Sequence, residues 1–144
     1  MIKLIPIYDK GVLLNQFQHF IEGLERVIDN SIGDTSLTQM FNSLMSGRLL
    51  MWGIFCENKY SGFVITELQE VPDGKKFLWI VQGYIKPGTD KDVFFEVLTC
   101  MEEQAKKIGA GSLRLQTMRD KGFEKKLSGK GWDKGYVEFD KEVR

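Results

Sequence analysis

The feature that most constrains the fold is a change of hydrophobic period near residue 93. From Val93 to Ile108 apolar residues recur every three or four positions, which indicates an amphipathic helix. Before it, short turn-forming segments at 57–59 and 71–74 separate three strand-like runs: Leu49 to Cys56, Tyr60 to Gln69 and Lys75 to Ile85. Such short connections favour antiparallel pairing of these three strands. The helix then predicts that the next apolar run, Ser112 to Thr117, returns parallel to the third of them.

The segments on either side of this unit complete the pattern. Residues 2–7 indicate a first strand, which Pro6 places near an edge of the sheet. Two helical patterns follow, at 13–28 and 37–45, and Ser36 with Gln39 has the spacing of a capping box before the second. Gly47 is expected to end that helix. The chain closes with a short helical pattern from Asp120 to Leu127 and a strand-like run from Trp132 to Phe139.

Composition limits the class of protein. The chain has 144 residues, of which 42% are hydrophobic, enough for one α/β domain covering residues 1–144. Its net charge of zero argues against a dedicated nucleic-acid binder. Two cysteines and one histidine make neither a zinc cluster nor a disulfide framework, so we expect no metal and a cytoplasmic location. No apolar run reaches the roughly 18 residues of a membrane span.

The order of elements resembles the fold of the Gcn5-related N-acetyltransferases, the GNAT fold. The segment Ile85-Lys86-Pro87 is similar to the Val-x-Pro strand ending of that family, and Gly131-Trp132 is similar to its later Gly-Phe. The resemblance implies a twisted, mostly antiparallel sheet with one parallel β-α-β pair. It also implies a cleft between the strands at 78–85 and 112–117 that takes the pantetheine arm of coenzyme A, with Pro87 and Gly88 at its mouth.

The loop before the long helix departs from the family pattern. The family has Gln/Arg-x-x-Gly-x-Gly/Ala there, so that a pyrophosphate can approach the N–H groups of the helix N-terminus. Alignment from Pro87 places Asp90, Val93 and Phe95 at these positions. Unit charges about 4 Å apart repel by about 1 kcal/mol even in water, so Asp90 and Asp92 oppose a pyrophosphate. We expect both aspartates to cap the helix, and Val93 and Phe95 to pack in or beside the core.

The position of the general acid departs as well. Many members of the family have a tyrosine five residues before the Gly-Phe aromatic residue, and this chain has Leu127 there, which has no proton to donate. If the protein is active, Glu67 is the candidate that activates an amine through water, with Tyr84 as a second candidate. A hydrated carboxylate on the polar face of a strand is the alternative interpretation of Glu67. Neither Cys56 nor Cys100 has the surroundings of an activated thiolate.

Two functions remain open. The departures favour a GNAT-fold protein without efficient coenzyme A chemistry, acting as a structural or interaction module. Such a function resembles that of degenerate GNAT-like proteins encoded by tailed phages, some of which are virion components. This resemblance implies a location in the host cytoplasm or in the virion. The alternative is a divergent acetyl-CoA-dependent N-acetyltransferase. Coenzyme A, if it binds, is then expected to contact Val81, Gly83, Ile85, Lys86, Pro87, Gly88 and Lys91.

The segment 119–136 is the candidate for association with a protein partner or a second copy. Trp132 and Tyr136 alternate there with basic residues, and aromatic residues are enriched at interfaces. A solvated helix face and aromatic rings packed inside the domain are the alternative interpretations. The basic residues are Arg119, Lys121, Lys125, Lys126, Lys130 and Lys134.

Overall fold

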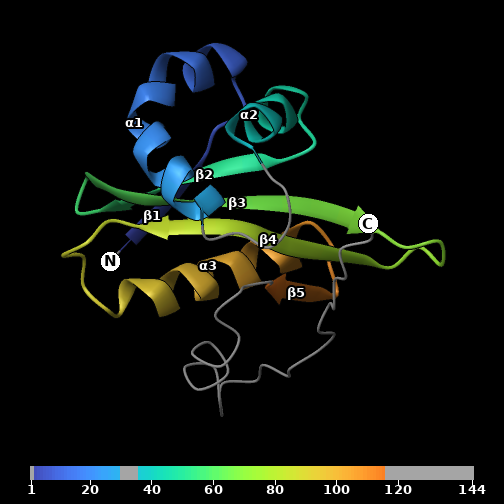
Figure 1. Ribbon diagram of the computed structural model, residues 1–144. Coiled ribbons are helices and arrows are strands. Elements are labelled where there is room, and N and C mark those ends of the chain that lie inside the picture. Colours follow the sequence, from blue (N-terminus) through green and yellow to red (C-terminus); the bar gives the residue numbers. More distant parts are fainter. Residues whose placement is uncertain (1, 30–35, 116–144) are drawn as a thin grey trace, which may run out of the picture.

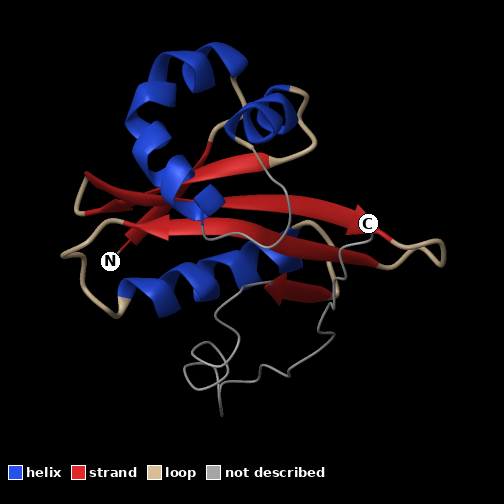
Figure 2. Ribbon diagram, in the orientation of Figure 1, coloured by secondary structure: helices blue, strands red, loops and turns tan. Residues whose placement is uncertain are grey.

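The computed structural model describes residues 2–29 and 36–115, which form a five-stranded sheet with helices on both faces (Figures 1 and 2). The strands lie in sequence order, so β1 is an edge strand, as Pro6 predicted. Pairing is antiparallel from β1 to β4, whereas β4 and β5 are parallel and pair residues 77–80 with 112–115. The expected mixed sheet is confirmed. The strands are β1 (Ile2–Pro6), β2 (Leu50–Cys56), β3 (Lys59–Glu70), β4 (Lys76–Ile85) and β5 (Ser112–Leu115).

Helices α1 (Lys10–Asp29) and α2 (Leu37–Met45) cover one face of the sheet, and α3 (Val93–Lys107) covers the other (Figure 1). Each face has its own hydrophobic cluster. The α1–α2 cluster consists of Leu13, Phe20, Leu24, Met40, Leu44, Leu49, Met51, Phe63 and Ile65. The α3 cluster consists of Trp52, Ile54, Val64, Leu78, Ile80, Val93, Val97, Leu98, Met101 and Ala105.

Local side-chain hydrogen bonds fix where the first two helices begin. The Asp9 carboxylate accepts the backbone N–H of Gly11 at 2.8 Å and caps α1. Before α2, the Ser36 hydroxyl accepts the backbone N–H of Gln39 at 3.1 Å, and the Gln39 side chain accepts the N–H of Ser36 at 2.9 Å. This confirms the predicted capping box. Gly47 follows α2 with a φ of 82°, a value that favours glycine after a helix.

A β-bulge interrupts β4 at Val81. Ile65 of β3 lies opposite Gln82 and the next residue, Thr66, lies opposite Ile80, so Val81 is an extra residue on its strand. The bulge changes which side chains reach each face. Ile80 belongs to the α3 cluster, whereas Val81 and Tyr84 pack against the α1–α2 cluster.

One of the three tryptophans of the chain belongs to the core. Trp52 is buried, and its indole N–H donates to the Thr66 hydroxyl at 2.9 Å. The predictions for Leu127, for the helix at 120–127, for the strand at 132–139 and for the segment 119–136 concern residues outside the described ranges.

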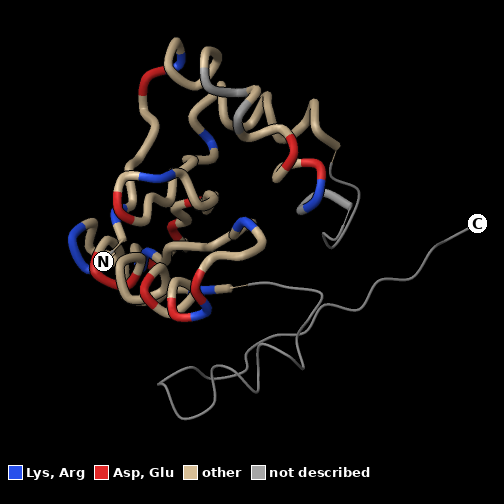
Figure 3. The backbone as a smooth tube through the Cα atoms, turned by 90° about the vertical axis from the view of Figure 1, so that its left-hand side faces the viewer, with Lys and Arg blue, Asp and Glu red and all other residues tan. Residues whose placement is uncertain are grey.

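Acidic and basic residues are both scattered along the described backbone (Figure 3). No helix in residues 2–29 or 36–115 is long and apolar enough to cross a membrane. The same ranges contain no cluster of His, Cys, Asp and Glu side chains that could hold a metal ion.

Candidate functional site

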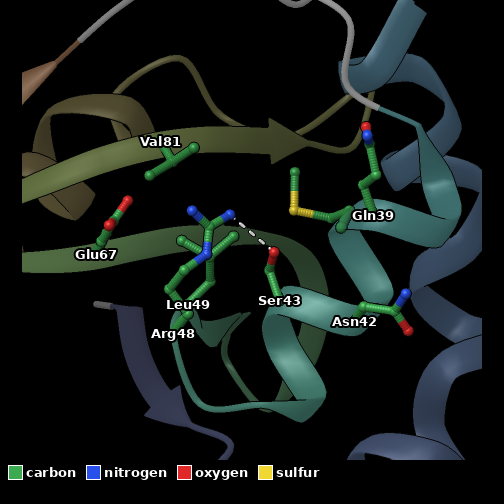
Figure 4. Close-up of a pocket in the computed structure, with 8 residues that line it drawn as sticks. Gln39, Asn42, Ser43, Arg48, Leu49, Glu67 and Val81 are labelled. Atoms are coloured by element: carbon green, nitrogen blue, oxygen red, sulfur yellow. Dashed lines mark hydrogen bonds between the residues drawn. The ribbon is translucent and has the colours of Figure 1, made fainter.

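A cavity of about 480 Å³ lies between α2 and the sheet (Figure 4). It brings together two residues that the sequence had assigned to different tasks, the candidate base Glu67 on β3 and the candidate cofactor contact Val81 at the bulge of β4. The residues that line it are Gln39, Met40, Asn42, Ser43, Arg48, Leu49, Glu67 and Val81.

Arg48 is a charged residue of this cavity that was not predicted from the sequence. It follows the turn at Gly47 that ends α2, and it is solvent-exposed. Its guanidinium Nη2 donates to the Ser43 hydroxyl at 2.8 Å (Figure 4). This bond uses one of five guanidinium N–H donors and holds the group beside the cavity.

Glu67 is half-buried, and its carboxylate extends into the same space as the Arg48 guanidinium (Figure 4). No ion pair joins the two groups in the part of the chain that the structure describes. Met40 and Leu49, both buried, form an apolar floor with the partly buried Val81. The cavity therefore has one acidic and one basic group above an apolar base.

Tyr84, the second catalytic candidate, does not line this cavity. The Tyr84 ring lies 5.7 Å from that of Phe63, and a Cβ on Gly23 of α1 would lie 2.5 Å from the Tyr84 ring. The bulge at Val81 shifts the alternation of β4 by one residue and puts Tyr84 on the α1–α2 face, where its ring packs against α1. A catalytic role for Tyr84 stays a prediction.

Tyr60 lies beside Tyr84 and has a hydroxyl with no hydrogen-bond partner among the described residues. Burial, together with the neighbouring Tyr84 and Glu22, raises the pKa of Tyr60 to about 12. The phenol is therefore neutral at physiological pH and does not serve as a base. On the other face, burial and the nearby Glu103 and Glu96 raise the pKa of the Cys100 thiol, which confirms that Cys100 is not an activated thiolate.

The loop between β4 and α3 contains most of the expected coenzyme A contacts. The backbone N–H of Lys86 donates to the Ser61 carbonyl at 2.8 Å, and its ammonium lies 5.6 Å from the centre of the Tyr60 ring. Three further expected contacts, Pro87, Gly88 and Lys91, are exposed in the loop.

The two remaining expected contacts belong to β4 itself. Gly83 is exposed and lies opposite Val64 of β3. Ile85 packs against the α3 cluster. Neither residue lines the cavity below α2.

A carboxylate of the chain itself lies in the turn that precedes α3. Asp90 Oδ1 accepts the backbone N–H of Asp92 at 2.9 Å, and the Asp90 carbonyl accepts that of Val93 at 3.1 Å. Asp92 stands at the N-cap position but forms no side-chain cap, and the Asp90 carboxylate accepts the N–H of Asp92 and not one of the helix, so the expectation that both aspartates cap α3 is wrong. Val93 is buried and Phe95 packs beside the α3 cluster, as expected.

These contacts test whether the loop fits the pyrophosphate of coenzyme A. The family places that anion against N–H groups at this helix start, and here the Asp90 carboxylate lies in the turn that precedes it. A second anion would also lie beside the Asp90 and Asp92 carboxylates, which would repel it. The phenyl ring of Phe95 stands where the family has a glycine. The residues present do not fit a pyrophosphate bound in the family's way.

No family model matches this chain, and no curated protein sequence matches it. Among solved structures, the chain is similar to an aminoglycoside acetyltransferase from an uncultured soil metagenomic sample, with a TM-score of 0.71, 15% identity and coverage of 99% of this chain and 97% of the other. It is also similar to a GNAT family acetyltransferase of Staphylococcus aureus, with a TM-score of 0.68, 14% identity and coverage of 99% and 98%.

A third similar structure is a predicted acetyltransferase of Clostridium acetobutylicum, solved with acetyl-CoA, with a TM-score of 0.65, 16% identity and coverage of 97% and 96%. Identities this low establish the fold and leave the activity open. The parallel β4–β5 pair, the long helix between these strands and the similarity over almost the whole chain agree: the protein has the GNAT-like fold.

Proposed function

We propose that the protein is a GNAT-fold binding module that does not use coenzyme A chemistry and holds a small polar ligand in the cavity between α2 and the sheet. The observation that supports this proposal is the hydrogen bond from the Asp92 N–H to the Asp90 carboxylate at the start of α3. A helix N-terminus attracts anions through its free N–H groups and its dipole. Here the charge beside that helix start is a carboxylate of the chain itself, which would repel an added anion.

Thermal denaturation with acetyl-CoA tests the proposal. A ligand present at a hundred times its dissociation constant stabilises a protein by about 2.7 kcal/mol. For a domain of this size, that corresponds to a rise in melting temperature of roughly 5–10 °C. We expect no change beyond error with millimolar acetyl-CoA. A saturable rise would overturn the proposal.

A divergent N-acetyltransferase is the second candidate, and the shared cavity of Glu67 and Val81 favours it. An acyl thioester would supply the acyl group in that reaction, and the thiolate released when the C–S bond breaks would take up a proton and leave as a free thiol. The Glu67 carboxylate would accept a proton from the amine, directly or through water, and the cavity would hold the amine beside the bulge of β4. Acetylation of small amines that is lost in the Glu67→Gln variant would favour this candidate.

The association predicted for residues 119–136 belongs to the first proposal, as does a virion role of the kind known for similar phage proteins. Replacing Lys125, Lys126 and Lys130 by Glu is expected to weaken association with a partner or a second copy. The melting temperature should change little, as for most surface substitutions. A strictly monomeric protein with no partner in its native source would contradict this part of the proposal.

A further inference from the structure

We infer that the ligand of the α2–sheet cavity is a small amino acid whose ammonium group binds Glu67 and whose carboxylate binds Arg48. The inference deepens the proposed function, because it names the class of ligand that the module holds. It rests on four observations about the cavity: two opposite charges, their lack of contact with each other, the fixed position of one of them, and the apolar floor between α2 and the sheet.

Arg48 provides the anion-binding end. The hydrogen bond to Ser43 Oγ restricts the guanidinium, so less conformational entropy is lost when a ligand binds. A guanidinium has several donors in one plane and matches the two oxygens of a carboxylate. Ser43 cannot neutralise the positive charge, because a hydroxyl is uncharged. The group therefore stays available to an anion.

Glu67 provides the ammonium-binding end. The carboxylate lines the cavity from β3 and has no ion pair with Arg48 in residues 36–115. Because the two opposite charges line one cavity without touching, a molecule that carries both an ammonium group and an anionic group can bind between them. A neutral ligand would leave both charges without a partner, and a simple amine would leave Arg48 without one.

The floor of the cavity suggests what joins the two ends of the ligand. Met40, Leu49 and Val81 supply apolar surface there. A short methylene chain would bury against this surface, which removes apolar area from water and favours binding. An amino acid with an aliphatic chain between its ammonium and carboxylate meets all three requirements.

Calorimetric titration of the full chain with a graded series of ligands tests the inference. The series is glycine, β-alanine, 4-aminobutyrate and 5-aminovalerate, which differ only in the spacing between ammonium and carboxylate. We expect one spacing to bind most tightly, and about tenfold tighter than the amine of equal length without its carboxylate. Equal affinity for that amine would overturn the inference. An aminoalkyl phosphonate of the best spacing distinguishes the anions, and tighter binding of the phosphonate would overturn the choice of a carboxylate.

Charge-removing variants assign the two ends. Arg48→Gln should weaken the amino acid about tenfold and leave the matched amine unchanged, and Arg48→Lys should restore part of the loss. Glu67→Gln should weaken both ligands. Glu70→Gln on the same strand and Lys107→Gln on α3 remove equal charges from exposed residues that do not line the cavity, so they serve as controls. Far-ultraviolet circular dichroism shows whether each variant is folded. Equal loss in the controls, or none in Arg48→Gln, would overturn the assignment.

The outcomes for the ligand and for the proposed function are separable. Binding of acetyl-CoA together with selective binding of the amino acid would contradict the coenzyme A-independent function and support the ligand class. Absence of acetyl-CoA binding with no preference for any amino acid would support the coenzyme A-independent function and contradict the ligand class.

Discussion

Charged side chains are arranged differently in the two candidate binding regions, the loop before α3 and the cavity below α2. In the loop before α3, the Asp90 carboxylate accepts a backbone N–H of its own chain, which places a negative charge beside the start of the helix. In the cavity below α2, Arg48 and Glu67 line one space and form no ion pair with each other within the described residues. The difference teaches that separate elements of the fold build the two regions, so the charges of one can change without those of the other.

The separation has a structural basis in β4. The strand contacts the cavity at Val81 and reaches the loop only after Ile85. The sheet fixes the cavity from β3 and β4, while the loop depends on a few backbone hydrogen bonds such as that from Lys86 to Ser61. Substitutions in the loop can therefore change anion binding without disturbing the cavity.

The largest expected effect comes from Gly62, where the sheet meets the loop. A Cβ at Gly62 would collide with the Tyr84 carbonyl oxygen and would lie 2.9 Å from its carbon, and neither backbone atom can move aside easily. We expect Gly62→Ala to lower the free energy of unfolding by about 3 kcal/mol. Urea denaturation measures the loss. A change below about 1 kcal/mol would contradict the close pairing of β3 with β4 at this point.

The next effect concerns the anion site of the loop. Asp90→Arg should remove a repulsion and add an attraction for pyrophosphate, together about 2 kcal/mol or roughly thirtyfold in acetyl-CoA affinity. Asp90→Asn, which can keep the turn and loses only the charge, should give a smaller gain. Calorimetric titration measures both. If neither variant binds better than the wild type, the carboxylate is not what excludes the cofactor.

Gly88 provides a smaller, matched contrast with Gly62. Its φ is 86°, but a Cβ there would meet no atom within 4 Å. Gly88→Ala should therefore cost only the backbone strain of about 1 kcal/mol. Urea denaturation of the two alanine variants in parallel tests the contrast. An equal loss of unfolding free energy at both positions would contradict it.

The smallest effect at neutral pH is expected for Tyr60→Phe, because the variant loses a buried hydroxyl without a partner among the described residues. Stability should stay the same or rise by up to about 1 kcal/mol. The folded pKa of about 12 exceeds the ordinary 10.0, so the contribution of neutral Tyr60 is complete below about pH 10 and is lost as pH rises toward 12. Urea denaturation at neutral and alkaline pH should show a smaller alkaline loss for the variant than for the wild type. An equal loss would contradict the raised pKa.

The sequence predicted the elements of the fold well because their signals are local. Pro6, the Ser36–Gln39 capping box and the period change at Val93 each act within a few residues, and all three predictions are confirmed. The bulge at Val81 was not predictable in this way. Residues 77–81 are apolar throughout, so no alternation of polar and apolar side chains reveals a change of face.

The candidate site was predicted in part for the same reason. Glu67 and Val81 were singled out and share one cavity, whereas Tyr84 packs toward α1 because the bulge changes the face of the residues after it. Arg48 had no local signal beyond its place after the glycine that ends α2. Only the packing of α2 on the sheet brings it near Glu67.

Equilibrium dialysis of the wild-type protein against radiolabelled acetyl-CoA tests the central claim most directly, because it measures binding at the loop without requiring catalysis. With Asp90 at the start of α3, we predict equal label on both sides of the membrane up to millimolar concentration. Saturable accumulation on the protein side in the micromolar range would contradict the claim that the chain's own carboxylate repels the cofactor's pyrophosphate.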